Sequence, residues 1–469
     1  MFHHRPATTA SSIPKRALLG VLLIAQLMVI IDISAVNVAL PDLARDLGIG
    51  GANVGWTITA YSLVFGSLLL LGGRAADLLG RRRVFLAGLS VFTVASLASA
   101  VADSSSVLFA ARAGQGLGAA MLSPAALSII MTAFKGAERT RALGAWGAVG
   151  GAGAAVGVLA GGALTELDWR AIFLINLPVG LVLAIGALEV VPRDHARPQW
   201  RGLDLPGAVL ATASLAALVY AISQATTAGW TSAQTLGIGA GGLAGLVAFA
   251  VLESRSARPL LRIERLADRA VGGGFLLMLT ASAVLFGTFL LSSMYLQNVL
   301  GTGALETGLM FLPLALAAGA GAHAGSHLIG KTGVRLPMAA GFAVAAAGTL
   351  LLSGVESGGG YLEDVLPGIV VSGMGLGVVL VAVAVSVLTG ARDEETGMLS
   401  GLNTTGHEIG GALGVAVLIS IASASGIADA FLAAAALSTA GALLALLVLP
   451  PARSFLPKMR LAPSAMPVH

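Results

Sequence analysis

The sequence contains no cysteine, few aromatic residues and few charged ones. Of its 469 residues, 5% are Phe, Trp or Tyr and 11% are Asp, Glu, Lys or Arg. Without cysteine the chain forms no disulfide, no thiolate metal site and no cysteine nucleophile. A soluble domain of this size carries roughly 25% charged residues to cover its surface. The low charge and the mean hydropathy of +0.90 therefore indicate a protein whose solvent is lipid.

Fourteen stretches are long and apolar enough to cross a bilayer, which requires about 20 mostly apolar residues. They lie at residues 18–40, 54–72, 84–102, 106–131, 142–164, 170–191, 205–224, 236–252, 271–296, 307–330, 337–354, 363–389, 401–424 and 427–449. The first is too long for a signal peptide and carries a charge, and Pro41 is expected to close it. The sequence therefore predicts an all-α polytopic membrane protein.

The basic residues are distributed unevenly between the two sides of this topology. When the N-terminus is placed inside, the outer segments contain only Arg45 and Arg170, and Arg112 lies within a stretch. Because cytoplasmic loops concentrate Lys and Arg, both termini are predicted to be cytoplasmic. This orientation accounts for the basic residues without a nucleic-acid partner. The Ala, Gly and Arg excess indicates a bacterial cytoplasmic membrane, and the tail after Pro450 is expected to be unstructured.

Three ionisable side chains lie deep in these stretches, where each costs about 2.5 to 3.5 kcal/mol to insert and is therefore a functional candidate. Asp32 lies about 13 Å and Arg112 about 9 Å from the same outer face, at 1.5 Å per residue, so neighbouring helices would allow a buried pair or a relay through water. Glu408 lies about 12 Å from the inner face, beside His407. It is either a polar helix end or, as we favour, a carboxylate facing a cavity.

His323 and His327 are four residues apart and share one helix face. This spacing occurs in metal sites, but no carboxylate lies beside the pair in the sequence. Helix packing or cavity lining is the favoured role. We predict neither a metal site nor a cofactor. The glycine-rich runs also lack the Gly-Lys-Ser/Thr ending of a nucleotide-binding loop, which argues against an ATP-driven pump.

Five segments carry motifs, and they follow one another in a consistent order along the chain. They run from Asp32 to Pro41, from Gly73 to Arg83, from Arg112 to Gly118, from Asp168 to Pro178 and from Gly401 to Gly414. Together they resemble the major facilitator superfamily, and within it the fourteen-helix drug:proton antiporters of bacterial multidrug and antibiotic efflux. One motif departs from that pattern, because Val158 stands where the antiporters have a proline after Gly157.

The resemblance implies two six-helix bundles that rock around a site near the membrane midplane. The bundles would span residues 18–191 and 271–449, with two linking helices over 205–252 and cytoplasmic tails at 1–17 and 450–469. The implied function is proton-coupled efflux of amphipathic drugs or antibiotics by alternating access. The partners would be protons, membrane lipid and small amphipathic substrates, cations among them. The protein would act as a monomer.

The predicted site residues form four groups. The proton-coupling group is Asp32, Arg112, Gln115 and Glu408. The latch group, in which charge pairs and helix-end contacts hold the two halves in one state, is Gly73, Asp77, Gly80, Arg81 and Arg82. The antiporter-motif glycines, which serve either sliding or static packing, are Gly153, Gly157, Gly161 and Gly162. The substrate cavity is expected to contain Met28, Asn37, Trp56, Tyr61, Phe65, Met121, Met294, Tyr295, Asn403 and His407.

Two alternatives share the same fold. A proton-coupled importer is kept open by Val158, and the direction of substrate movement distinguishes it from an exporter. A dedicated transporter of one metabolite or natural product is the other. The sequence shows neither a catalytic constellation nor an attached soluble domain, so no enzyme activity is predicted.

Overall fold

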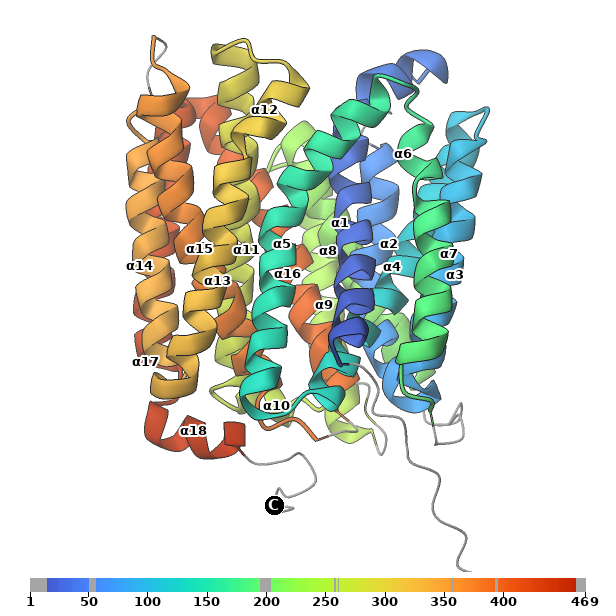
Figure 1. The fold of residues 1–469 in the computed structure, drawn as a ribbon, viewed down its shortest axis with the longest axis vertical. Helices are drawn as coiled ribbons and strands as arrows, with labels where there is room; N and C mark the ends of the chain where they lie inside the picture. The colour runs from blue at the N-terminus through green and yellow to red at the C-terminus, as the bar shows by residue number, and fades with distance from the viewer. Residues whose placement is uncertain are drawn as a thin grey trace, which may run out of the picture.

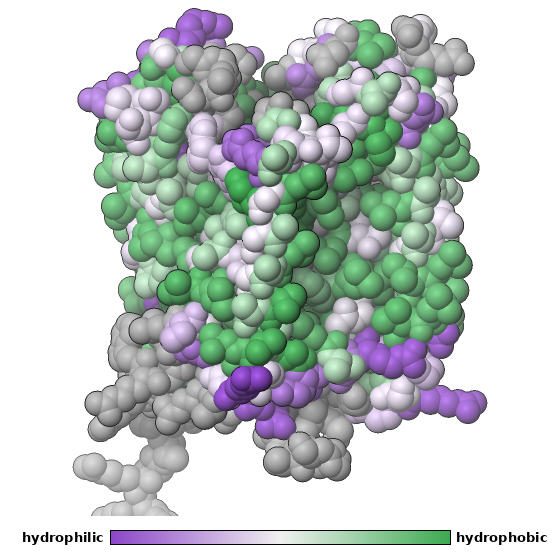
Figure 2. Space-filling model, turned by 180° about the vertical axis from the view of Figure 1, so that it is seen from behind, coloured by the Kyte–Doolittle hydropathy of each residue, from purple (hydrophilic) through white to green (hydrophobic). Residues whose placement is uncertain are grey.

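The computed structural model describes residues 15–49, 56–194, 204–256, 259, 261–355, 358–392 and 395–460. These residues form helices and connecting turns, with no strand among them, which confirms the all-α prediction. Most helices run side by side along the long axis of the molecule (Figure 1). Figure 2 shows a wide hydrophobic band across the middle of the face in view, with hydrophilic residues gathered toward its two ends.

The first part of the chain forms the helices that precede the linking pair. They are α1 (Lys15–Asp46), α2 (Trp56–Leu79), α3 (Arg81–Ala100), α4 (Ser105–Ala133), α5 (Gly136–Thr165), α6 (Ala171–Leu174) and α7 (Asn176–Val190). The linking pair is α8 (Leu205–Ala228) and α9 (Ala233–Arg255), followed by the short α10 (Glu264–Ala267).

The second part of the chain forms the remaining helices. They are α11 (Val271–Met294), η3 (Tyr295–Val299), α12 (Ala304–Met310), α13 (Leu312–Thr332), α14 (Arg335–Leu352), η4 (Tyr361–Val365), α15 (Leu366–Leu388), α16 (Thr396–Ser425), α17 (Ile427–Val448) and α18 (Ala452–Arg460). Each predicted stretch overlaps one of these helices.

Twelve helices in the described residues are long and apolar enough to cross a membrane. The two further stretches that the sequence predicts lie in α5 and α8. There the apolar segments of described residues run over Val156–Thr165 and Pro206–Ile222, within helices of 30 and 24 residues.

Two boundary predictions were wrong. Helix α1 continues past Pro41 to Asp46, because a proline in a helix removes one backbone hydrogen bond without always ending the helix. The tail after Pro450 is not wholly unstructured, since residues 452–460 form α18. Its Phe455 is buried and lies 3.8 Å from the position that a side chain on Gly333 would occupy. An apolar anchor therefore holds this short helix at the end of α13.

The helices pack in two sets with a seam between them. In the first set α4 packs on α2 and α3, and α5 packs on α1; in the second, α15 packs on α13 and α14, and α16 packs on α11. Across the seam, α2 packs on α16 and α5 packs on α13. The linking helix α8 contacts α9, α2 and α16, so it lies against both sets. This arrangement places the polar residues of α1, α4 and α16 near one another.

Candidate transport site

A buried polar cluster surrounds Asp32 in the middle of α1. Its Oδ2 atom accepts a 2.5 Å hydrogen bond from Arg112 Nη1. Its Oδ1 atom accepts hydrogen bonds from Gln115 Nε2 at 2.8 Å and from Asn176 Nδ2 at 3.0 Å. Asp32 and Arg112 are each 1% exposed. The two opposite charges that the sequence placed at similar depth therefore form a direct pair, which three helices hold.

Further hydrogen bonds fix the orientation of this cluster. Ser96 on α3 accepts bonds from Gln115 Nε2 at 2.9 Å and from Asn176 Nδ2 at 3.3 Å. Gln115 Oε1 accepts bonds from Arg112 Nη1 at 2.9 Å and from Ser99 Oγ at 3.2 Å. Because Gln115 accepts through one atom and donates through the other, it links the guanidinium to the carboxylate. Buried polar networks of this kind hold one geometry when every member is satisfied.

The guanidinium of Arg112 lies between two aromatic rings and a backbone carbonyl. Its central carbon lies 4.5 Å from the centre of the Tyr61 ring and 5.9 Å from that of Phe173. Its Nε donates a 3.1 Å hydrogen bond to the Thr57 carbonyl. Aromatic faces attract a cation, most strongly where water is excluded. Arg112 is therefore held by a charge, a carbonyl and an aromatic face at once.

Glycines in α4 bring this cluster together. A side chain on Gly116 would meet the Tyr61 carbonyl at 2.5 Å, and one on Gly118 would meet the Phe92 nitrogen at 2.5 Å. Helix α4 can therefore lie close to α2 on one side and to α3 on the other. Small residues at helix contacts permit this approach in membranes. The motif Arg112 to Gly118 thus supplies both the charge and the close packing around it.

At one end of the molecule, Asp77 joins the two helix sets. Its Oδ1 and Oδ2 atoms accept hydrogen bonds from the backbone N–H groups of Gly397 at 2.9 Å and Met398 at 3.0 Å. These groups lie in the first turn of α16, where N–H groups lack partners within the helix and attract negative charge. Arg81 Nη2 donates to Thr396 Oγ1 at 3.0 Å. We call Asp77, Arg81 and the first turn of α16 the latch.

The two backbones at the latch are nearly in contact. A side chain on Gly73 would lie 2.1 Å from the carbonyl oxygen of Gly397, and one on Gly397 would lie 2.2 Å from that of Gly73. Both positions therefore require glycine while the latch is closed. Ser128 on α4 adds a 2.9 Å hydrogen bond to Thr396, so α2 and α4 both hold α16.

The other predicted latch residues bind within the first set. Arg82 donates through Nη2 to the Leu188 carbonyl, and Asp194 accepts from the backbone N–H groups of Arg82 at 3.3 Å and Arg83 at 3.0 Å. Gly80 has φ of +109°, a conformation that favours glycine, and a side chain there would also meet Asp194 at 2.4 Å. These residues shape the sharp turn between α2 and α3 rather than the contact with α16.

A second cluster, which the sequence did not predict, holds the start of α16 from the linking segment. Glu395 accepts hydrogen bonds from Arg262 Nη1 at 3.0 Å and from Arg265 Nη2 at 2.9 Å. Arg265 also donates to the Gly390 carbonyl at 2.9 Å. Glu395 is buried. The segment between α9 and α11 is thus tied to the same helix end that Asp77 holds.

At the opposite end, the motif from Asp168 to Pro178 is tied to α1. Asp46 accepts hydrogen bonds from Arg170 Nη1 at 2.8 Å and from Trp169 Nε1 at 3.1 Å. These bonds hold the pKa of Asp46 below its ordinary value of 3.8, and the bond with Arg170 contributes most. Asn176 of the same motif donates to Asp32, so this motif both anchors the turn between α5 and α6 and completes the buried cluster.

Three of the predicted antiporter-motif glycines pack α5 against α1. Side chains at Gly153, Gly157 and Gly161 would meet Ile30, Ser34 and Ala35 at 2.7, 2.6 and 2.6 Å. Gly162 faces Leu305 on α12 instead, at 3.6 Å. The glycine spacing thus places α5 closely against α1, and the same helix also meets the second set.

A central cavity lies between the two sets. Its lining comprises Gln26, Ile30, Ser123, Trp146, Gly147 and Gly150 from the first set and Met278, Leu380, Ala384, Asn403, Thr404 and His407 from the second. The centre of a water molecule can occupy about 50 Å³ of it, which is room for a few waters. Drug-sized sites hold several hundred Å³, so the cavity is contracted in this conformation.

Comparison with known proteins shows to which family the chain belongs. The sequence profile described as Major Facilitator Superfamily matches residues 22–415. The chain belongs to the major facilitator superfamily. Members of this superfamily are transporters, and the chain is accordingly a multi-pass membrane protein.

Several bacterial relatives are similar over most of their length. The puromycin resistance protein pur8 of Streptomyces alboniger is 41% identical over 412 residues, covering 87% of this chain and 82% of that protein. The cephamycin export protein CmcT of Amycolatopsis lactamdurans is 41% identical over 405 residues, covering 85% and 83%. The tetracenomycin C resistance and export protein of Streptomyces glaucescens is 31% identical over 416 residues, covering 88% and 77%.

A solved structure supports the fold. The human organic anion transporter MFSD10 superposes with a TM-score of 0.69 at 18% identity, covering 92% of this chain and all of that one. At this identity the likeness concerns the fold alone. The helix arrangement described above is thus that of a major facilitator.

The predicted cavity residues of this major facilitator are spread over several environments. Asn403 and His407 line the central cavity. Met28, Tyr61 and Phe65 are buried within the first set, and Met121 packs beside them. Trp56 lies against Tyr220 of α8, with ring centres 6.2 Å apart. The remaining members lie elsewhere: Tyr295 is buried in a cluster of the second set, Met294 is half-buried next to it, and the Asn37 side chain lies outside the described part of the chain.

Glu408 and its neighbour His407 point in different directions. His407 lines the cavity and its Nδ1 lies 2.7 Å from Ser282 Oγ. Glu408 is not among the cavity-lining residues. A side chain on Gly66 would lie 4.0 Å from the Glu408 Cβ atom and 3.8 Å from Val219. Glu408 therefore sits where α2, α8 and α16 meet.

The histidine pair of α13 is exposed on the outside of the molecule. The rings of His323 and His327 have centres 5.0 Å apart, as expected for neighbours on one helix face. No group of three or more metal-binding side chains occurs within the residues that the structure describes. The exposure of both side chains argues against cavity lining.

Of the twelve residues that line the central cavity, the sequence predicted Asn403 and His407 alone, and Gln26, Ser123 and Trp146 are among those it missed. Gln26 accepts a 2.8 Å hydrogen bond from Ser123, and both line the cavity beside Trp146. Gln26 is the one amide in an otherwise apolar part of α1, and that was the available signal. Ser123 and Trp146 carried none, because single serines and tryptophans are common on packed membrane helices.

Proposed function

We propose that this major facilitator exports small amphipathic compounds, antibiotics among them, across a bacterial cytoplasmic membrane in exchange for protons. The relatives named above are called puromycin resistance, cephamycin export, and tetracenomycin C resistance and export proteins. Transport proceeds by alternating access between two six-helix bundles, residues 18–191 and 271–449. The fourteen-span topology, with both tails in the cytoplasm, belongs to the same proposal.

The observation that carries the proton coupling is the position of Asp32. Its carboxylate is buried with Arg112, and it lies two residues from Ile30, which lines the central cavity. A carboxylate that takes up a proton loses its charge and becomes a donor. Its charge-assisted bond to Arg112 then weakens, and the cluster can rearrange. Proton binding and helix movement are thereby linked through one pair of residues.

Gln115 tunes that pair, because it bonds to both partners. Substrate and proton need not touch. Each only has to favour a different conformation or protonation form for their binding to be coupled. The contracted cavity and the closed latch together support a state in which the inner end is shut.

Glu408 supplies a second carboxylate for cationic substrates, in this proposal by neutralising their charge as α2 and α16 move apart. Its position at the meeting point of three helices supports this role. Ethidium efflux is the test, with a neutral substrate as the internal control. If Glu408→Gln leaves both unchanged, Glu408 has no such role.

The test of the whole function is transport in inside-out vesicles energised by a proton gradient. We expect uptake of puromycin or ethidium by the wild type, loss of gradient-driven uptake in Asp32→Asn, and full uptake in the matched control Asp42→Asn, an exposed α1 carboxylate. Uptake that persists undiminished in Asp32→Asn overturns Asp32 as the coupling site. Accumulation of substrate by whole cells that express the protein would instead indicate an importer.

The topology is tested separately, and the chain suits the method because it has no cysteine. Single cysteines introduced at Arg141 and Lys331 should react with a membrane-impermeant reagent in inside-out vesicles alone. Reaction in intact cells would show that the orientation is the opposite of the proposed one.

A further inference from the structure

Two buried hydroxyls beside the Asp32–Arg112 pair lack partners. They belong to Thr57 and Tyr61, which lie four residues apart on α2 and so share one face of that helix. Both residues are 0% exposed. Neither Thr57 Oγ1 nor the Tyr61 hydroxyl makes a hydrogen bond within the part of the chain that the structure describes. Because a buried hydroxyl without a partner is costly, this conformation gives no reason for either group.

Both residues already contact the guanidinium of Arg112. The Thr57 carbonyl accepts a 3.1 Å hydrogen bond from Arg112 Nε, and the centre of the Tyr61 ring lies 4.5 Å from the central guanidinium carbon. Helices α2 and α4 lie close together here, since a side chain on Gly116 would meet the Tyr61 carbonyl at 2.5 Å. The two unpartnered oxygens thus belong to residues that hold a buried charge.

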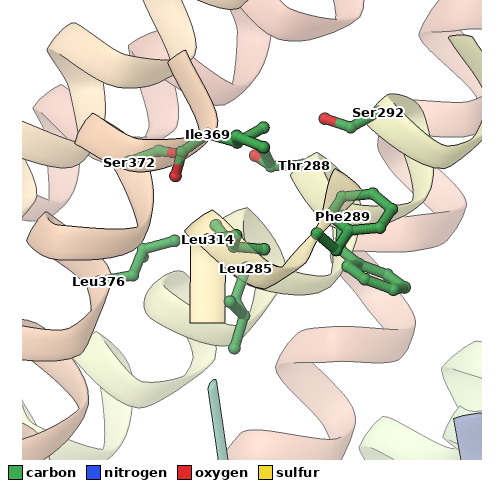
Figure 3. Close-up of a pocket in the computed structure, with 9 residues that line it drawn as sticks. Leu285, Thr288, Phe289, Ser292, Leu314, Ile369, Ser372 and Leu376 are labelled. Carbon is green, nitrogen blue, oxygen red and sulfur yellow. The ribbon is translucent and has the colours of Figure 1, made fainter. Parts of the chain in front are cut away.

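This setting distinguishes the two hydroxyls from another unpartnered pair. Thr288 and Ser292 of α11 also lack partners among the described residues, and they border a small, mostly apolar pocket (Figure 3). The centre of a water molecule can occupy about 10 Å³ of that pocket, which is room for about one water. No charge lines it. Beside Thr57 and Tyr61, in contrast, a charged group is already in contact.

Proton uptake by Asp32 would leave Arg112 in need of acceptors. In this conformation Arg112 Nη1 donates to Asp32 Oδ2 and to Gln115 Oε1. A protonated Asp32 is neutral and donates a hydrogen bond itself, whereas a guanidinium has five N–H donors, no acceptor and a proton that it does not release. A buried charge that loses its counter-charge is strongly destabilising. Neutral oxygens beside the guanidinium would reduce that cost.

We propose that the hydroxyl oxygens of Thr57 and Tyr61 are the alternative partners of Arg112, and that they accept hydrogen bonds from its guanidinium when Asp32 carries a proton. One proton moves in this step, from water to the Asp32 carboxylate, and Arg112 keeps its own protons. Thr57 and Tyr61 are positioning residues, because they act on Asp32 through Arg112. They favour proton binding by stabilising the proton-loaded state. This inference rests on the proposed proton coupling at Asp32.

Arg112 is the one charged side chain that bonds to Asp32 among the described residues. Gln115 of α4 and Asn176 of α7, which donate to the same carboxylate, are neutral. The other charged residues of α1, α2, α5 and α7 lie toward the ends of those helices, and α6 has none. The protonation of Asp32 therefore depends above all on Arg112 and on what else Arg112 can bond to.

Glu408 is the other carboxylate beside this part of α2. Its Cβ atom would lie 4.0 Å from a side chain on Gly66, and Gly66 is five residues, or about 7.5 Å along the helix, from Tyr61. A measurement of proton binding therefore has to separate Glu408 from Asp32.

The test measures the Asp32 carboxyl group by infrared spectroscopy of the full chain in nanodiscs. A protonated carboxyl has a carbonyl band that a carboxylate lacks, and the part of this band that Asp32→Asn removes belongs to Asp32. All variants carry Glu408→Gln, so that Glu408 does not contribute. In Thr57→Val/Tyr61→Phe we expect the midpoint of the Asp32 band to move to lower pH by about one unit or more. This equals about tenfold weaker proton binding, as for the loss of a hydrogen bond to a charged group.

The matched control is Thr349→Val/Tyr361→Phe in the second helix set. It removes the same two kinds of hydroxyl from residues that have partners, since Thr349 donates to the Ala345 carbonyl at 2.9 Å and Tyr361 to the Met310 carbonyl at 2.7 Å. Its Asp32 band should keep the parent midpoint, as should that of Thr57→Ser, which retains a hydroxyl. An unmoved midpoint in Thr57→Val/Tyr61→Phe, a move to higher pH, or an equal fall in the control overturns the inference.

Thermal unfolding in alkaline buffer separates this role from a structural one. Asp32 is charged there and the two hydroxyls have no partner, so Thr57→Val/Tyr61→Phe should unfold at no lower temperature than its parent. The control should unfold at a lower temperature, because it removes hydroxyls that are bonded. A lower unfolding temperature in Thr57→Val/Tyr61→Phe would show that the hydroxyls support the fold, and would overturn the inference. If the double variant does not fold, Tyr61→Phe alone provides both measurements.

The inference and the proposed function fail in different ways. If Asp32→Asn removes no titrating carbonyl band, Asp32 takes up no proton, and its coupling role falls together with the inference. If the Asp32 band titrates equally with and without the two hydroxyls, the inference alone is overturned. If the wild type exports no compound but the band moves as expected, the export function is overturned and the alternative partners of Arg112 stand.

Discussion

The Oδ1 atom of Asp77 accepts a 2.9 Å hydrogen bond from the backbone N–H of Gly397, 320 residues further along the chain. Because the donor lies in the first turn of α16, the carboxylate acts as a helix cap supplied by the other half of the molecule. Contact between α2 and α16 at this end thus depends on a charge at α2 and on the N–H groups in the first turn of α16.

Replacing Asp77 by Ala should favour the conformation in which the latch is open. Replacement of a helix-capping residue by Ala costs about 0.5–2 kcal/mol, so this change should raise the ratio of open to closed molecules by about twofold to thirtyfold. Spin labels on Arg141→Cys and Lys331→Cys, on the latch-side ends of α5 and α13, would report this as a longer distance. Asp42→Ala is the control. An unchanged distance distribution in Asp77→Ala would show that the cap does not hold the latch.

A methyl group at Gly73 should open the same end by a steric route. Its Cβ would lie 2.1 Å from the Gly397 carbonyl oxygen, and overpacking of this kind costs about 1–3 kcal/mol. Gly73→Ala should therefore lengthen the same spin-label distance and slow transport. Gly319→Ala, where nothing lies within 4 Å of the added atom, should behave like the wild type. Equal behaviour of the two variants would refute the steric argument.

The Asp32–Arg112 pair should give strongly non-additive effects on stability. Loss of one partner leaves a buried charge without its counter-charge, at about 3–5 kcal/mol. We expect Asp32→Asn to lower the unfolding temperature more than Arg112→Met, because a carboxyl group can take up a proton whereas a guanidinium cannot release one. The double variant should be less destabilised than the sum of the two. Thermal unfolding in detergent measures all three, and additive effects would argue against a coupled pair.

The turn between α5 and α6 should lose stability in acid. The pKa of Asp46 in the folded protein lies below its ordinary value of 3.8, so its bonds to Arg170 and Trp169 stabilise the fold above that pH. The contribution is lost as the pH falls through the lower, folded value. In Asp46→Asn this loss is absent. The difference in unfolding temperature between wild type and variant should therefore be constant above about pH 5 and shrink below 3.8; a difference that grows in acid would contradict it.

Periodicity and charge scarcity were enough to predict the helices and the Asp32–Arg112 pair. Asp32 and Arg112 lie at similar depth in apolar stretches, where few other charged side chains are present for either to pair with. The sequence could not reveal that Ser96 and Asn176 complete the cluster, because single polar residues of that kind usually bond within their own helix. It also missed Glu395, whose arginine partners lie 130 and 133 residues earlier, in the segment between α9 and α11.

The direction of a side chain was harder to predict than its depth. His407 and Glu408 are adjacent, so they point about 100° apart around the helix, and only one can face the cavity. Nothing in the surrounding pattern says which, since both flanks of α16 contain glycine. The packing of α16 against α11, α2 and α8 decides it, and that packing depends on segments far away in the chain.

The position of α8 determines what would happen if the helix pair α8 and α9 were removed. Helices α8 and α9 could be regarded as a removable spacer between two bundles. Yet α8 covers the junction of α2 and α16, where Glu408 lies. Without α8, acyl chains would meet a carboxylate at a depth where an ionised group costs about 2.5 to 3.5 kcal/mol. A variant of this protein without α8 and α9 would therefore need a neutral residue at position 408.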